Sequence, residues 1–162
     1  MDKHDALALH EAYVNGDLES IKYLLDDPPD FPNCRGPWGL GEIILEYAIY
    51  HSPFEFIRTL LNLGADPNYG DNKGFPSIIA ALSTDRKDRL NIVELLLSNG
   101  ADIQQYGLNG YTPLHHAAAS DDVEAVKLLL IPSFDLGDDS VDVLNQYVQD
   151  PDLHLLDFLR FL

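Results

Sequence analysis

The sequence is poor in cysteine and in basic residues. Its 162 residues include one cysteine, Cys34, so no internal disulfide can form, and a single thiol is typical of a reducing compartment. Lysine and arginine number 10 against 27 aspartates and glutamates, which gives a net charge of −17. Such a charge repels nucleic acid and anionic membranes and attracts basic partners. Solubility alone accounts for this charge equally well.

Long apolar runs are also missing. No segment approaches the roughly 20 apolar residues that a membrane-spanning helix needs. The first residues, MDKHDALALHEAY, do not form a basic region followed by a long apolar run. We therefore expect no membrane span, no signal peptide and a cytoplasmic location.

The sequence does contain a repeated pattern. Four segments end in leucines, namely GDLESIKYLL (16–25), SPFEFIRTLL (52–61), DRLNIVELLL (88–97) and DDVEAVKLLL (121–130). Their last leucines lie 36, 36 and 33 residues apart. The stretches before them also align, and they share an alanine at one position: Ala12, Ala48, Ala81 and Ala117. Each unit is therefore expected to hold two short helices.

The second helix of each unit carries an apolar stripe. In the last unit Val123, Val126, Leu129 and Leu130 fall on one helical face. Neither helix can bury such a stripe alone, so neighbouring units must stack. The small alanine lets neighbouring helices approach closely. The pattern predicts an all-α solenoid.

The pattern resembles the ankyrin repeat family. GYTPLHHAAA (110–119), followed by DDVEAVKLLL, carries that family's signature almost unaltered, and the turns LGADPN (63–68) and NGADIQ (99–104) match it too. The resemblance implies an ankyrin-repeat solenoid of helix-turn-helix units with protruding β-turn or hairpin loops. It divides a single domain, 1–162, into an N-terminal capping repeat (5–33), repeats 34–68, 69–104 and 105–132, and a degenerate C-terminal capping repeat (133–162).

Six residues are assigned structural roles. The resemblance implies that His115 bonds Thr112 and the neighbouring loop, and that His10 takes the same position in the first unit. Pro113 suits the first turn of a helix, and Thr112 before it suits the N-cap. Gly64 and Gly100 follow leucine-rich helices, where a left-handed C-cap is expected.

Two loops are longer than the pattern requires. DDPPDFPNCRGPWGLG (26–41) carries the only tryptophan, Trp38, and its prolines stiffen it. STDRKDR (83–89) holds Asp85, Arg86, Lys87 and Arg89 where the next unit has a shorter turn. We interpret this second insertion as a solvated, mixed-charge loop.

The sequence contains no arrangement typical of an enzyme. His115 and His116 are adjacent, and adjacent helical residues point about 100° apart, so they do not face one metal ion. Nothing orients Cys34 toward His51, and no glycine-rich phosphate loop is present. We predict no catalytic, cofactor or metal site. Aromatic residues without accompanying basic residues argue against nucleic-acid binding.

Ankyrin-like arrays bind proteins through their loop tips and the exposed side of their first helices. Carried onto this sequence, that surface contains Trp38, Leu40, Glu42, Tyr50, His51, Tyr69, Asn72, Lys73, Phe75, Tyr106, Leu108, Asn109 and Tyr111. Tryptophan and tyrosine are favoured anchors of protein interfaces. The alternative for Phe75 and Tyr111 is that their rings pack on neighbouring loops and stabilise the array.

Two functions remain open. The first is a monomeric, non-enzymatic module that binds a protein partner through this surface. If the acidic charge contributes to binding, the partner has a basic surface. The second is an acidic inhibitor, an immunity protein or antitoxin that neutralises a basic toxin or nucleic-acid enzyme. The charge of −17 favours the second because it speeds association with a cationic cleft.

Overall fold

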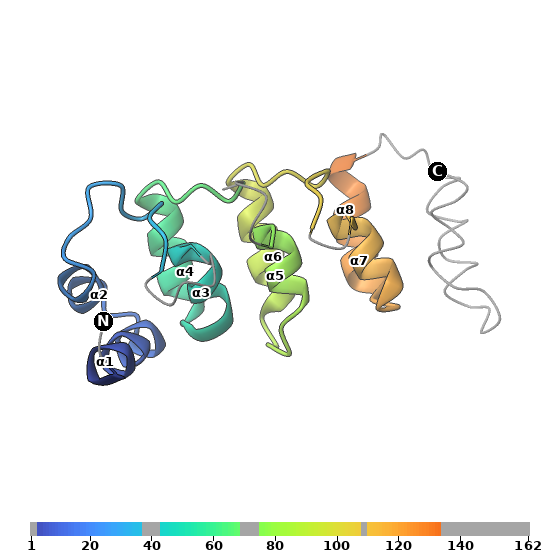
Figure 1. Ribbon diagram of the computed structural model, residues 1–162. Helices are drawn as coiled ribbons and strands as arrows, with labels where there is room; N and C mark the ends of the chain where they lie inside the picture. Colours follow the sequence, from blue (N-terminus) through green and yellow to red (C-terminus); the bar gives the residue numbers. More distant parts are fainter. Residues whose placement is uncertain (1–2, 37–42, 69–74, 108–109, 134–162) are drawn as a thin grey trace, which may run out of the picture.

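In the computed structural model, which describes residues 3–36, 43–68, 75–107 and 110–133, these residues form eight helices in four antiparallel pairs (Figure 1). The first unit holds α1 (Lys3–Asn15) and α2 (Leu18–Leu24), and the second holds α3 (Ile44–His51) and α4 (Phe54–Asn62). The third holds α5 (Ser77–Leu82) and α6 (Arg89–Ser98), and the fourth holds α7 (Pro113–Ala119) and α8 (Val123–Ser133). The loops that join successive units run along one edge of the stack (Figure 1).

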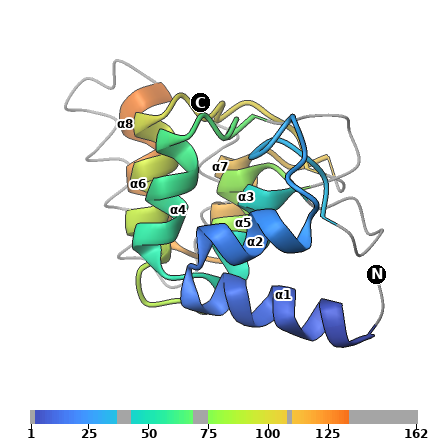
Figure 2. The same cartoon turned by 90° about the vertical axis from the view of Figure 1, so that its left-hand side faces the viewer.

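The units stack in two rows of helices. The first helices pack in succession, α1 on α3, α3 on α5 and α5 on α7, while α4, α6 and α8 form a second row (Figure 2). Within each unit the two helices pack on each other. The prediction of an all-α solenoid of helix-turn-helix units is confirmed.

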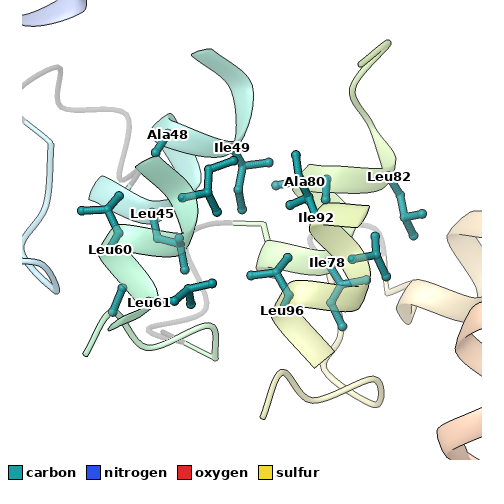
Figure 3. Close-up of a cluster of buried hydrophobic side chains, with 14 of the residues drawn as sticks. Leu45, Ala48, Ile49, Leu60, Leu61, Ile78, Ala80, Leu82, Ile92 and Leu96 are labelled. Atoms are coloured by element: carbon teal, nitrogen blue, oxygen red, sulfur yellow. The ribbon is translucent and has the colours of Figure 1, made fainter. Parts of the chain in front are cut away.

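The core lies between the two rows and continues from unit to unit. All four alanines at the shared position are buried, as are Leu9, Leu45 and Ile78 one turn before three of them. In the middle of the stack, side chains of α3 and α4 meet those of α5 and α6 in one cluster (Figure 3). A fully buried leucine or isoleucine contributes about 1.5–3 kcal/mol. Stacking therefore supplies the burial that an isolated pair lacks.

Glycines end two of the second helices in the left-handed conformation. Gly64 and Gly100 have φ of +93° and +84°. After Gly64, the Ala65 amide donates to the Leu60 carbonyl at 2.9 Å, and the Gly64 amide donates to the Leu61 carbonyl at 3.0 Å. This pair of bonds forms a Schellman motif, which satisfies the last carbonyls of α4. The same two bonds recur at Gly100.

Two asparagines tie each turn to the next. The Asn33 side chain donates to the Gly64 carbonyl at 2.9 Å and accepts from the Asp66 amide at 2.7 Å. Asn68 repeats this arrangement one unit further on, with the Gly100 carbonyl and the Asp102 amide, both at 2.6 Å. These bonds fix the spacing of the loops along that edge. The sequence signal was a Pro-Asn pair, Pro32-Asn33 and Pro67-Asn68, after two successive leucine-ended segments.

The interpretation of residues 83–89 as a solvated loop is wrong for its two arginines. The guanidinium of Arg86 is 20% exposed; it bonds both oxygens of Asp88 and donates to the carbonyls of Ile49 and Ser52 in the preceding unit. Arg89 pairs with Asp122 of the following unit at 2.5 Å. The longer turn reaches both neighbours, which a shorter turn would not. Asp85 and Lys87 remain exposed.

No helix within the described residues is long and apolar enough to cross a membrane. The C-terminal capping repeat predicted for 133–162 falls almost wholly outside those residues, so the subdivision of the domain into capping and full repeats stays a prediction.

Candidate protein-binding face

The first-helix face consists of the loops between units and the exposed side of the first helices. At its edge the chain doubles back in two places: Arg35 and Ile43 form an antiparallel bridge, and the Gly107 amide donates to the Tyr111 carbonyl at 2.8 Å. We call the two loops that these contacts close, 35–43 and 107–111, the fingers. The finger tips, including Trp38, lie outside the described residues.

Five predicted contact residues lie on this face within the described part of the chain. Tyr50 and His51 end α3, and Phe75 lies just before α5. Tyr106 precedes the finger at 107–111, and Tyr111 is its last residue. The other eight lie outside the described residues: Trp38, Leu40, Glu42, Tyr69, Asn72, Lys73, Leu108 and Asn109.

The four large rings among these residues are open to solvent. The exposed fractions are 37% for Tyr50, 42% for Phe75, 69% for Tyr106 and 38% for Tyr111. The ring of Tyr111 lies 6.0 Å from the imidazole of His115, so one side of it is supported. Rings that served only to pack neighbouring loops would be more deeply buried. Exposed aromatic side chains of this kind are common anchors of protein interfaces.

A cluster of rings occupies the contact between the first two units, and we call it the ring cluster: His10, Tyr47, Tyr50 and His51. The His51 imidazole lies 5.2 Å from that of His10 and 4.4 Å from the ring of Tyr47, measured between centroids. The Nδ1 atom of His10 and the Tyr47 hydroxyl form a hydrogen bond of 2.9 Å. Tyr13, which is fully buried, packs against Tyr47 from behind at 4.8 Å.

Two groups of the ring cluster have shifted pKa values. Burial, and then the neighbouring His10, lower the pKa of His51, so its imidazole is neutral at pH 7. Burial, and then the Glu46 carboxylate, raise the pKa of Tyr50. Both rings are therefore uncharged at neutral pH.

The comparison with protein families agrees with the repeat architecture. Residues 70–140 match the model of a family described as ankyrin repeats (3 copies). This part of the chain consists of ankyrin repeats. Ankyrin repeats generally mediate protein–protein interactions.

Relatives of this ankyrin-repeat chain come from varied organisms. An interferon antagonist of monkeypox virus is 39% identical over 90 residues, which cover 56% of this chain and 30% of that protein. A protein of Rickettsia felis described as an ankyrin repeat protein is 29% identical over 131 residues, 78% of this chain and 32% of that protein. Alpha-latroinsectotoxin-Lt1a of Latrodectus tredecimguttatus is 31% identical over 129 residues, which cover 78% of this chain and 9% of that protein. The chain thus spans about a third or less of each of these relatives.

The ankyrin signature residues of the fourth unit form a local hydrogen-bonded group. The Thr112 hydroxyl oxygen lies 2.7 Å from His115 Nδ1 and accepts from the His115 amide at 3.4 Å, capping α7. Pro113 occupies the first turn of that helix. His10, at the matching ankyrin position of the first unit, instead bonds Tyr47 of the next unit. The histidine at this repeat position therefore bonds within its own unit in the fourth unit, and bonds the next unit in the first.

The sequence analysis missed His116 as a residue that links two ankyrin units. Its Nε2 atom lies 3.2 Å from the Ser83 hydroxyl, which itself donates to the Ile79 carbonyl at 2.7 Å. Ser83 therefore accepts from the protonated Nε2, and Nδ1 is buried without a hydrogen-bond partner among the described residues. Burial lowers the pKa of His116.

The described residues offer little to an enzyme mechanism. They contain no group of three or more histidine, cysteine, aspartate or glutamate side chains placed to hold a metal ion. Burial, and then Asp30, raise the pKa of the Cys34 thiol to about 11. A thiol protonated at neutral pH is a poor nucleophile.

Proposed function

We propose that this ankyrin-repeat chain is a non-enzymatic, cytoplasmic module that binds a protein partner through its first-helix face. The observation that carries the proposal is the set of solvent-exposed rings on that face, Tyr50, Phe75, Tyr106 and Tyr111. Aromatic side chains bury a large area for few rotatable bonds, and they dominate the energetics of protein interfaces. The predicted contact residues at the finger tips, Trp38 among them, are part of the same proposal.

The charge favours a basic protein partner over nucleic acid or a membrane. The chain carries −17 overall, and two of its arginines are paired with aspartates: Arg86 with Asp88 in the same turn, and Arg89 with Asp122 of the next unit. Their charge is therefore largely neutralised within the fold. The remaining excess of carboxylates attracts a cationic surface and speeds its approach at low ionic strength.

The test compares the two sides of the stack. Phe75→Ser and Tyr111→Ser remove rings from the first-helix face, whereas Tyr23→Ser removes a still more exposed ring from α2, outside that face. Purified variants with unchanged melting are immobilised, and proteins captured from a lysate are quantified by mass spectrometry. We expect the first two variants to lose specific partners that Tyr23→Ser retains. Equal capture by all three would contradict the proposed face.

The second candidate function is an acidic inhibitor of a basic toxin or nucleic-acid enzyme, acting through the same face. The net charge of −17 is the observation that favours it. For such an inhibitor, the association rate with its target falls steeply as ionic strength rises, because steering between opposite charges is screened. A captured partner without enzymatic activity, or an association rate indifferent to salt, would argue for the plain binding module.

A further inference from the structure

The ring cluster combines aromatic faces, the neutral imidazole of His51 and a nearby buried carboxylate, Glu46, at one exposed point. Tyr50 and His51 are open to solvent, while His10 and Tyr47 are half-buried beside them. We propose that the ring cluster is a subsite for one cationic side chain, an arginine or lysine of the protein partner. This inference rests on the proposed function and specifies what the partner presents at this point.

The spacing of the rings suits a cation. An ammonium or guanidinium group is attracted to an aromatic face when it lies within about 6 Å of the ring centroid. In the ring cluster, neighbouring centroids are 4.4 Å (Tyr47 to His51) and 6.2 Å (Tyr50 to His51) apart. Tyr50 and His51 are the exposed rings of the cluster, and a cation seated between them lies within that distance of both centroids. The attraction of each ring adds to that of its neighbours.

The rings are held before any partner arrives. The hydrogen bond between His10 and Tyr47 joins α1 to α3, and buried Tyr13 supports Tyr47 from behind. Phe56 of α4 in turn lies 6.3 Å from Tyr13. A partner side chain that enters the cluster orders few groups of the protein, so less of the interaction free energy is lost to entropy.

The electrostatic surroundings also favour a cation. Glu46 lies one helical turn before Tyr50, is buried, and acts on the Tyr50 hydroxyl through its charge. Among the described residues, Arg86 donates to the carbonyls at this end of α3, and both oxygens of Asp88 accept from its guanidinium. His51, with its lowered pKa, adds a neutral ring at pH 7 instead of a competing charge.

The experiment uses a capped five-residue peptide with one central arginine, and the same peptide with citrulline as its neutral isostere. Each is titrated into the full chain, with the aromatic signals of the ring cluster followed by NMR. We expect the arginine peptide to shift these signals and to bind more tightly than the citrulline peptide. Removal of one exposed ring by Tyr50→Leu should weaken the arginine peptide roughly two- to fivefold.

Matched variants separate the ring from other effects. Tyr50→Phe keeps the aromatic face and should retain the affinity, and Tyr23→Leu, which removes an exposed tyrosine outside the cluster, should change nothing. His51→Asn removes a second ring and serves if Tyr50→Leu fails to fold. Protonation of His51 introduces a like charge, so the affinity should fall as the pH is lowered from 7.5 to 5.5.

Equal binding of the two peptides, or full affinity in both Tyr50→Leu and His51→Asn, would overturn the subsite. That result leaves the proposed function standing as long as Phe75→Ser and Tyr111→Ser still lose captured partners. If those variants lose nothing either, the proposed face is wrong as well.

Discussion

Replacement of Arg86 by methionine tests whether the 83–89 turn holds two units together. The guanidinium donates to both oxygens of Asp88 at 2.8 and 2.7 Å, to the Ile49 carbonyl at 3.3 Å and to the Ser52 carbonyl at 2.5 Å. Methionine keeps most of the apolar stem and removes all of these donors. The substitution therefore isolates the polar contacts between the turn and the end of α3.

The expected loss of unfolding free energy is about 2–4 kcal/mol. A hydrogen bond to a charged group contributes roughly 1.5–3 kcal/mol. The side chains of Arg86 and Asp88 are 20% and 33% exposed, so solvent screens their ion pair and the bonds to the two carbonyls supply most of the effect. In a chain of this size a loss of that order lowers Tm by roughly 4–16 °C.

Urea denaturation and thermal melting measure this loss of stability, and hydrogen exchange shows which part of the structure is affected. The Ser52 amide, which donates to the Ala48 carbonyl at 2.8 Å, should exchange faster in Arg86→Met because the end of α3 is released. Lys87→Met is the matched control, since Lys87 is exposed, and should change stability by no more than about 0.5 kcal/mol. Equal midpoints for the two variants would refute the reasoning.

The pH dependence offers a second check on the same contact. The hydrogen bonds from Arg86 lower the pKa of Asp88 below its ordinary value of 3.8. A carboxylate with a depressed folded-state pKa stabilises the fold above its unfolded pKa and loses that contribution as the pH falls through the folded value. The difference between the parent chain and Arg86→Met should therefore shrink below about pH 4.

Three further predictions concern contacts within and between units. Asn68→Ala removes the bonds to the Gly100 carbonyl and the Asp102 amide, and should cost about 1–2 kcal/mol in urea denaturation, whereas a change under 0.3 kcal/mol would exclude the link. Thr112→Ala removes the N-cap of α7 and should cost roughly 0.5–2 kcal/mol, with faster amide exchange at His115 and not in α3. Because burial lowers the pKa of His116 below 6.5, the unfolded chain takes up the proton first as the pH falls. The urea midpoint should then drop more between pH 7.5 and 5.5 in the parent chain than in His116→Gln, and parallel drops would contradict the assignment.

Much of the fold follows from the spacing of apolar residues. The leucine runs and the shared alanine repeat at intervals that place two helices in each unit. The shared alanines are buried, and the last leucines of the four segments are buried (Leu61, Leu130) or half-buried (Leu25, Leu97). The main error was at residues 83–89, where a run of charged residues in a turn suggested a solvated loop. Arg86 and Arg89 instead find partners 34 to 37 and 33 residues away, in the units on either side.

The candidate binding face was predictable in part. Phe75 and Tyr111 follow a glycine at the same position of two units, which marks a loop next to a first helix, and their rings are exposed. The ring cluster was harder to foresee. His10 and His51 lie in different units and at positions that do not match, so their proximity depends on how α1 packs against α3.

Periodicity alone is thus sufficient to establish that the helices pair, stack and bury one face each. An apolar stripe with the helical period is removed from water only when another helix packs against it. The polar contacts between units have a different origin. The bonds of Asn33, Arg86 and His116 cross from one unit to another, and each depends on turn lengths and on the rotation between neighbouring units. Local propensities carry no information on those quantities, so these partners emerge only when the units are packed against one another in three dimensions.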